Sequence, residues 1–460
     1  MRATEKAHRL LTYFCVLFLS PKHENEVIII GKITVVDAPC GAGKTSWAIR
    51  MINADPERAF VYCTPFLSEI GRIRDACGRG RIAEPQYRGT TKLEDFNRLL
   101  AEGGSIAVTH MTLLNATSDT LRGIHEGKYT LILDECLDVV CDFNSSPHVD
   151  DAPQQIVSAD DIKMLRDKRL IEVDSNYKVR WIGDNYGDDF KFREVMRQAN
   201  HGNLYCVREE MLVVVYPPEV FREFEQVYVL TYKSDGNLLS AYFELFGIEH
   251  EKMSIIQSGE EYELVTYSED ADADFRRSCH DLITVCGNER LNDNGTLSVS
   301  WYINAKQAAL KSLKNNVGYY FFRELHEMHP KGRDIMWTCP NEYRKKIQGK
   351  GYTCVRSLTA EELKLPEEER KKYECFVPCN AKATNVYRDR WALAYCCNMF
   401  QNPMIRGFFN DRGIGFDEDE YALSALIQWI FRSRIRDGLP IWIYIPSSRM
   451  RNLLERWLEV

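Results

Sequence analysis

The stretch that decides the fold is "DAPCGAGKTSWAIRMINA", residues Asp37–Ala54. It contains Ala38-x4-Gly43-Lys44-Thr45, the pattern of a phosphate-binding loop with alanine at its first position. The apolar run "EVIIIGKITVV" before it predicts a buried parallel strand, and "TSWAIRMINA" after it predicts a helix. A strand, a glycine loop and a helix N-terminus in this order favour a nucleotide phosphate site over an ordinary turn.

The loop residues suit this chemistry. Gly41 and Gly43 allow the backbone to turn its N–H groups towards phosphate oxygens. Lys44 is placed to reach the β and γ phosphates, and the Thr45 hydroxyl is placed to bind Mg²⁺. The predicted phosphate-binding residues are Gly41, Ala42, Gly43, Lys44, Thr45 and Ser46.

A second strand supplies the carboxylates that such a loop requires. "KYTLILDECLDVV" predicts an apolar strand that ends at Asp134-Glu135. The carboxyl ends of parallel strands face the ligand crevice of an open α/β sheet. We expect Asp134 to bind Mg²⁺ together with Thr45, and Glu135 to orient or deprotonate the attacking water.

Asp134-Glu135-Cys136-Leu137 resembles the D-E-x-x box of superfamily 2 helicases and translocases. The C-terminal stretches "QWIFRSRIRDG" and "IYIPSSRMRNLLERWL" resemble helicase-like proteins of phages and mobile elements. The resemblance implies two RecA-like P-loop domains, ATP as the nucleotide, Mg²⁺, and nucleic acid as the partner. Leu230-Thr231-Tyr232 occupies the place of motif III, usually S/T-A-T, so the coupling role of that motif stays open. The resemblance also implies strand-end contacts with the backbone of one nucleic-acid strand, at Thr64, Thr109, His110, Thr338, Thr384 and Asn385.

A C-terminal pattern resembles motif VI of the same family. Gln428-x2-Phe431-Arg432-x3-Arg436 departs from Q-x-x-G-R-x-x-R, because Phe431 replaces the glycine and the last arginine is displaced by one position. If a helix continues to Asp437, positions 428, 432 and 436 form one stripe. We expect Gln428, Arg432 and Arg436 to act at the γ-phosphate, with Arg432 first as an arginine finger. A solvated basic helix is the alternative.

The predicted fold class is α/β, with two RecA-like domains of parallel sheets flanked by helices. An N-terminal helix is expected over residues 1–25, the first domain over 26–250 and the second over 251–460. A segment at about 142–222 predicts an insertion with a helix and a hairpin, "LIEVD" and "YKVRWI". Its basic residues form an ordinary solvated face or, as the less favoured alternative, contact nucleic acid.

Composition narrows the class of protein. The chain has 460 residues, a net charge of −8 and 15 cysteines with irregular spacing. Such a long chain does not need disulfides, so we expect reduced thiols in a cytoplasmic protein. Nucleic-acid contact must come from local basic surface, because the overall charge opposes it. No stretch is long and apolar enough to predict a membrane helix.

The leading hypothesis is an ATP-dependent helicase or translocase that hydrolyses ATP between two domains and moves along, or unwinds, nucleic acid. A single strand is the expected partner, with DNA favoured over RNA and a recruiting protein as a further candidate. The alternative is a P-loop ATPase motor or switch that acts on a protein partner. A non-catalytic nucleotide-binding scaffold is disfavoured, because it does not need the water-positioning Glu135.

Overall fold

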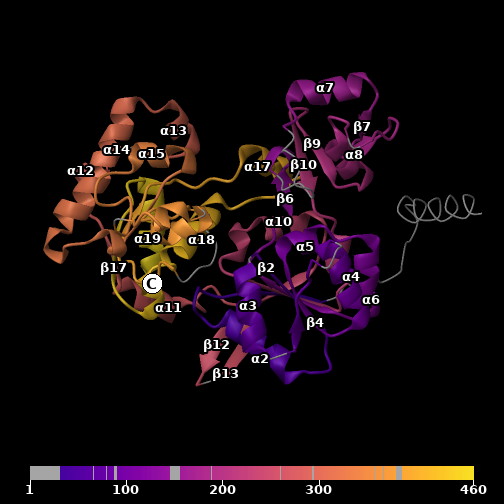
Figure 1. The fold of residues 1–460 in the computed structure, drawn as a ribbon, viewed down its shortest axis with the longest axis horizontal. Coiled ribbons are helices and arrows are strands. Elements are labelled where there is room, and N and C mark those ends of the chain that lie inside the picture. Colours follow the sequence, from indigo (N-terminus) through magenta and orange to yellow (C-terminus); the bar gives the residue numbers. More distant parts are fainter. Residues whose placement is uncertain are drawn as a thin grey trace, which may run out of the picture.

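The computed structural model describes residues 32–459 except 66, 79, 88–90, 146–155, 188, 260, 293–294, 357, 366 and 380–385. The expected N-terminal helix over residues 1–25 lies outside this part of the chain. Two α/β units lie side by side, each built on a mainly parallel sheet, and a smaller lobe projects from the first (Figure 1). The predicted fold class is therefore confirmed.

The first sheet has eight strands in the order β13-β12-β1-β11-β5-β2-β4-β3. Every neighbouring pair is parallel except β12 and β13, which form an antiparallel edge. The strands are β1 (Lys32–Asp37), β2 (Phe60–Thr64), β3 (Ile82–Ala83), β4 (Ser105–Thr109), β5 (Thr130–Asp134), β11 (Gln226–Thr231), β12 (His250–Ser258) and β13 (Glu261–Thr266). The sheet thus extends past residue 250, where we predicted the second domain to begin.

Helices cover both faces of this sheet because its central strands are apolar on both sides. Val36, Tyr62 and Ile132 pack on the face that α2 and α3 cover, while Val35, Val61 and Leu131 pack on the opposite face. The helices are α2 (Lys44–Ala54), α3 (Leu67–Ala76), α4 (Lys92–Glu102), α5 (His110–Leu114), α6 (Ser118–Glu126), α9 (Glu219–Arg222) and α10 (Leu238–Leu245).

The predicted insertion forms a lobe of its own. It holds the three-stranded antiparallel sheet β6-β10-β9 and the hairpin β7-β8, which confirms the predicted hairpin. A separate core lies between α7, α8 and these strands. The elements are β6 (Val140–Asp142), α7 (Ala159–Asp167), β7 (Ile171–Val173), β8 (Val179–Trp181), α8 (Arg193–Asn200), β9 (Leu204–Val207) and β10 (Met211–Val215).

The second unit has a four-stranded parallel sheet in the order β14-β17-β16-β15. Its strands are β14 (Ile283–Val285), β15 (Ile335–Thr338), β16 (Ala392–Tyr395) and β17 (Ile441–Tyr444). One face packs on α11 (Ala273–His280), α18 (Glu418–Ile430) and α19 (Ser448–Leu458). The other face packs on a helical layer that includes α12 (Glu289–Asn292), α13 (Val299–Asn304), α14 (Gln307–Tyr319) and α15 (Arg344–Ile347). A short α16 (Glu367–Arg370) follows this layer.

One helix of the C-terminal half returns to the first unit. α17 (Pro403–Asn410) lies between β16 and α18 in sequence, yet it reaches the base of the inserted lobe (Figure 1). Ile405, Phe408 and Phe409 are buried in the core of the first unit. Within the described residues no helix is long and apolar enough to cross a bilayer.

Candidate nucleotide site between the two units

The phosphate-binding loop joins β1 to α2 as predicted. β1 is buried between β11 and β12, so the loop leaves the sheet at the carboxyl end of a central strand. Gly41 has φ 89° and Gly43 has φ 93°, backbone conformations that L side chains rarely adopt. Gly43 directly precedes α2, and the open N–H groups of this helix begin at Lys44. The loop therefore has the geometry of an anion cradle at a helix N-terminus.

Lys44 lies inside the cradle rather than on the surface. Its ammonium group donates hydrogen bonds to the backbone carbonyls of Ala38 and Pro39, the latter at 2.9 Å. Burial lowers the pKa of Lys44, and the charges of Cys40, Asp37, Asp134 and other acids nearby oppose that decrease. Thr45 follows in the first turn of α2, half-buried, and Ser46 beside it is exposed.

Asp134 ends β5 next to the loop, where we predicted a metal ligand. Its carboxylate accepts a 2.6 Å hydrogen bond from the hydroxyl of Tyr62, a buried residue of β2 that the sequence did not single out. Burial raises the pKa of Asp134, while the Tyr62 hydrogen bond and the charge of Lys44 lower it. His110 fixes the strand end from the other side, with Nε2 3.1 Å from the Asp134 carbonyl oxygen.

Glu135 leaves the strand in a left-handed conformation, with φ 65°, and its N–H donates to Leu230 O at 3.1 Å. Few residues other than glycine adopt this conformation. It sets the direction in which the chain leaves β5.

The C-terminal arginines approach the loop from the second unit, although not on the continuous helix that we predicted. α18 ends at Ile430, and Arg434–Asp437 form a separate 3₁₀ turn. The helix stops because Ser433 is extended, its hydroxyl donates to Ile430 O at 2.6 Å, and the Arg434 N–H donates to Arg390 O at 3.0 Å. The predicted single stripe of three side chains is therefore wrong.

Both arginines nevertheless lie near the phosphate-binding loop. Burial raises the pKa of Cys40 in that loop, and the charges of Lys44, Arg432 and Arg436 oppose this rise. Burial lowers the pKa of Arg432, with Glu135 as the first opposing charge. Cys40 also packs against the core of the second unit. Lys44 and Glu135 of the first unit and Arg432 and Arg436 of the second thus lie near the same loop.

Gln428 lies a turn earlier on α18 and takes a different place. Its amide donates to Ser424 Oγ at 3.2 Å, and the Ser424 hydroxyl donates to Tyr232 O at 3.1 Å. Gln428 thus bonds to the residue of its own helix that links α18 to the end of β11.

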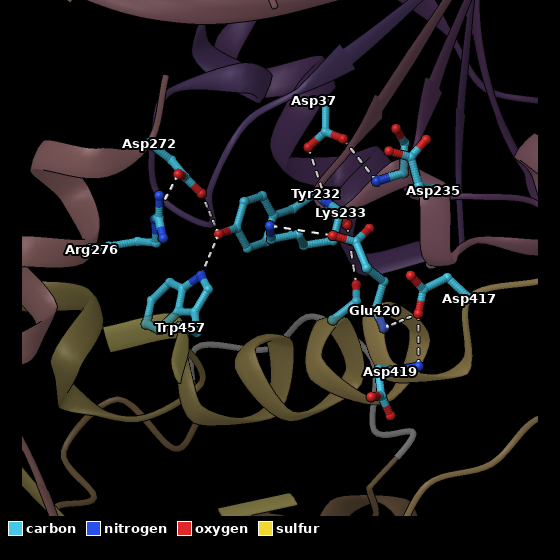
Figure 2. A network of polar contacts seen from close by, with 12 residues as sticks. Asp37, Tyr232, Lys233, Asp235, Asp272, Arg276, Asp417, Asp419, Glu420 and Trp457 are labelled. Carbon is cyan, nitrogen blue, oxygen red and sulfur yellow. Dashed lines mark hydrogen bonds and ion pairs between the residues drawn. The ribbon is translucent and has the colours of Figure 1, made fainter. Parts of the chain in front are cut away.

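A turn after β11 connects the two halves of the site, and sequence reasoning did not find it. Figure 2 shows the carboxylate of Asp37, the residue before the loop, accepting the N–H groups of Lys233 and Ser234 at 2.9 and 2.8 Å. The Lys233 ammonium lies 3.4 Å from Glu420 on α18. The same short turn therefore contacts the residue before the phosphate-binding loop on one side and, on the other, the helix that leads to Arg432.

Tyr232 begins this turn and inserts into the second unit. Its buried hydroxyl donates to Asp272 Oδ2 at 2.6 Å and accepts from Trp457 Nε1 at 2.8 Å (Figure 2). Arg276 holds the other oxygen of Asp272 at 2.8 Å. Tyrosine in place of the second threonine of motif III thus makes contacts that a threonine is too short to make.

The residues predicted to contact nucleic acid are mostly buried or half-buried. Thr64, Thr338 and His110 are buried, with exposed fractions of 1%, 0% and 8%. Thr64 ends β2, an inner strand of the first sheet, and Thr338 ends β15, the edge strand of the second, as predicted, but both residues are buried, which corrects the expectation that they contact nucleic acid. Thr109 is half-buried and caps α5 by accepting the Thr112 N–H. Thr384 and Asn385 lie outside the described residues.

The cysteines agree with the expectation of thiols. The described cysteines form no disulfide, and no cluster of metal-ligating side chains occurs within the part of the chain that the structure describes.

The fold and the site define a protein of two α/β units, with a loop of phosphate-binding geometry at the carboxyl end of a central strand of the first. Comparison with known proteins places the chain more narrowly. It is 33% identical over 443 residues to the "SPbeta prophage-derived uncharacterized protein YonV" of Bacillus subtilis, covering 93% of this chain and 99% of the relative. The chain belongs to the YonV family.

Two family models match parts of the chain. The "YonV C-terminal Rossmann-like domain" matches residues 277–458, which hold the second sheet. The "YonV middle domain" matches residues 153–214, within the inserted lobe.

Helicases are among the similar solved structures. "XPD_APO" has a TM-score of 0.49 at 12% identity, covering 93% of this chain and 96% of that one. "Structure of S. tokodaii Xpd4" has a TM-score of 0.48 at 12% identity, covering 93% and 94%.

Proposed function

We propose that the chain is an ATP-dependent motor that hydrolyses ATP between its two units and moves along, or unwinds, nucleic acid. The observation that carries the proposal is that the phosphate-binding loop packs at Cys40 on the core of the second unit, which includes Phe431 next to Arg432. Lys44 and Glu135 of the first unit and Arg432 and Arg436 of the second act on this one position of the loop. Such an arrangement is typical of ATPases that complete their site with an arginine from a second domain.

The residues present fit a triphosphate with Mg²⁺. Around Gly41, the place that a side chain would take is open, with no heavy atom within 4 Å. The Arg432 Nε is buried and has no hydrogen-bond partner within the described residues, which leaves a donor for an anionic oxygen. The Thr45 hydroxyl and the Asp134 carboxylate are oxygen ligands of the kind that Mg²⁺ prefers.

Each residue then has a stated role. Lys44 and the loop N–H groups hold the β and γ phosphates, and Mg²⁺ when bound neutralises charge on the phosphate oxygens. Glu135 orients the attacking water and accepts its proton. Arg432, with Arg436, stabilises the negative charge that develops on the transferred group. Gln428 positions α18 through Ser424 and is assigned no contact with the nucleotide.

Steady-state ATP turnover of the full chain tests the proposal. Glu135→Gln should still bind a fluorescent ATP analogue but lose turnover, and Lys44→Ala should lose both. Glu126→Gln and Lys128→Ala change exposed residues of the same unit and should leave both unchanged. Normal turnover by Glu135→Gln would contradict the assigned role.

The alternative, an ATPase that acts on a protein partner, has one observation in its favour. Thr64 and Thr338, which would contact a nucleic-acid strand, are buried. Turnover measured with and without single-stranded DNA and RNA separates the two functions, because a translocase hydrolyses ATP faster when its track is present.

A further inference from the structure

The helical layer of the second unit carries a basic surface on a protein whose net charge is −8. Residues 306–350 contain ten lysines and arginines against four aspartates and glutamates, a local charge of +6. The exposed members on α14, on α15 and just after it include Lys311, Lys345, Lys346 and Lys350. The question is whether these charges are structural or serve a partner.

The two helices that carry these lysines lie against each other (Figure 1). The Tyr352 hydroxyl fixes their relative position, because it lies 3.2 Å from the carbonyl oxygen of Lys314 on α14 and 2.7 Å from that of Ile347 on α15. Thr353 also donates to Gly349 O at 2.9 Å, which holds the loop that carries Lys350. The basic residues therefore belong to one surface.

Two exposed aromatic rings lie on this surface. Tyr319, the last residue of α14, is 50% exposed, and Phe322, three residues further on, is 37% exposed. Phe322 lies in a five-residue π-helix, Tyr320–Glu324, a rare element that is frequent at functional sites. Its ring packs against Gly351, where a Cβ would come within 2.6 Å of the ring. The ring is thus next to Lys350.

Some basic residues of this layer form ion pairs that stabilise the fold, and others do not. Arg344, on the same helix, pairs with Glu374 at 2.6 Å and packs on the Phe376 ring, so it has a structural role. Lys311, Lys345 and Lys350 have no ion-pair partner within the described residues. Exposed lysines contribute little to packing, and half of Tyr319 is uncovered, so a binding role is the better explanation.

We propose that Lys311, Tyr319, Phe322, Lys345, Lys346 and Lys350, the α14–α15 surface, bind single-stranded nucleic acid. Lysines contact the phosphates, and the two rings stack on bases, the combination by which single strands are bound without sequence preference. From Lys311 to Phe322 the helix rises about 16 Å, the length of about five stacked nucleotides.

The location also suits a ligand. α15 follows β15 closely, so it lies beyond the carboxyl end of a parallel strand, the edge at which α/β sheets bind ligands. The choice of nucleic acid over an acidic protein depends on the exposed rings and on the proposed motor function.

Binding of labelled oligothymidylate and oligouridylate to the full chain, followed by fluorescence anisotropy over a range of salt concentrations, tests the proposal. The variant Lys345→Gln/Lys346→Gln/Lys350→Gln should reduce the slope of log K against log salt by about 2, since each single-strand phosphate contact contributes about 0.7. Phe322→Ala should weaken binding by about tenfold and leave the slope unchanged.

The matched control is Lys128→Gln/Lys163→Gln/Lys168→Gln, which removes the same charge from exposed positions of the first unit and the inserted lobe. This control should bind like the unaltered chain. If it loses as much affinity as the triple variant of the α14–α15 surface, or if that variant keeps its slope, the proposal is overturned. Preferred binding of polyglutamate over both oligonucleotides also overturns it, in favour of an acidic protein partner.

The outcome is separable from that of the motor function. Basal ATP turnover without nucleic acid should be the same in all three variants, since none of their positions belongs to the loop or to the proposed catalytic residues, and Lys128 precedes the amino end of β5 whereas Glu135 follows its carboxyl end. Loss of turnover in Glu135→Gln with normal oligonucleotide binding supports both proposals, whereas normal turnover there with salt-sensitive binding at the α14–α15 surface contradicts the catalytic assignment alone.

Discussion

Replacing Gly236 by alanine should separate nucleotide binding from catalysis. Gly236 is buried in the turn that follows β11, and its φ lies outside the left-handed region, so the backbone itself tolerates alanine. A Cβ there would meet the backbone of α18, with the Tyr421 nitrogen nearest and the Glu420 carbonyl carbon at 2.5 Å. These are helix backbone atoms, which cannot move aside as a flexible side chain can.

The structure sets the size of the effect. An ordinary contact needs about 3.4 Å or more, so α18 and the turn must separate by roughly 1 Å, at a cost of about 1–3 kcal/mol in the free energy of unfolding. Arg432 follows α18 directly, and a misplacement of about 1 Å in a catalytic group can lower a rate by about 100-fold. The phosphate loop belongs to the first unit and keeps its own geometry.

We therefore expect Gly236→Ala to bind a fluorescent ATP analogue normally and to turn over ATP about 10- to 100-fold more slowly. Gly71→Ala is the control, because Gly71 lies within α3 with no atom within 4 Å of an added Cβ. Circular dichroism and urea denaturation show whether each variant is folded. Unchanged turnover together with an unchanged denaturation midpoint in Gly236→Ala would refute the reasoning.

Three further predictions concern other contacts. Tyr232→Phe removes one hydrogen bond to the Asp272 carboxylate and one from Trp457. It should lower the free energy of unfolding, measured by urea denaturation, by about 2–4 kcal/mol. A loss below about 0.5 kcal/mol would contradict the assigned contacts. Phe408→Ala should cost about 3–5 kcal/mol in the same assay, because the ring is fully buried, whereas Phe400→Ala at a 44% exposed ring should cost little. The hydrogen bond from Lys191 and those from Ser158 lower the pKa of Asp161 to about 2, so their contribution to stability is present above about pH 4 and decreases as the pH falls towards 2. An NMR titration that gives Asp161 an ordinary pKa would contradict this.

The parts of the site that the sequence predicts are those in which the chemistry and the structure are local. The phosphate loop and Asp134 each depend on one strand and the few residues after it, and the β-branched runs before them indicate buried strands. The structure brings the two together because β1 and β5 both pair with β11 in parallel, so their carboxyl ends meet at one edge.

The arginines show where local reasoning stops. The resemblance to motif VI identifies these arginines, but the continuous helix expected for them is broken at Ser433. The break depends on Arg390, whose carbonyl oxygen accepts the N–H of Arg434, 44 positions later in the chain. Propensity alone gives no sign of this contact. The strand-end threonines fail for a related reason, since a residue at the end of a strand is exposed only if nothing packs over it.

The contacts of the turn of residues 232–236 are the hardest to predict from the sequence, because Tyr232 and its partner Trp457 are 225 residues apart. Its contacts explain how two sequence-distant half-sites can act together. Asp37 holds the turn through two backbone N–H groups, and α18 contacts the same turn through Ser424 and Glu420. A shift at the end of β1 therefore either breaks the Asp37 bonds or moves the turn. If the turn moves, either its bonds to α18 break or α18 moves with it. Only movement of α18 with the turn keeps all of these bonds, so displacement of the phosphate-binding loop is most easily transmitted to the helix that leads to Arg432.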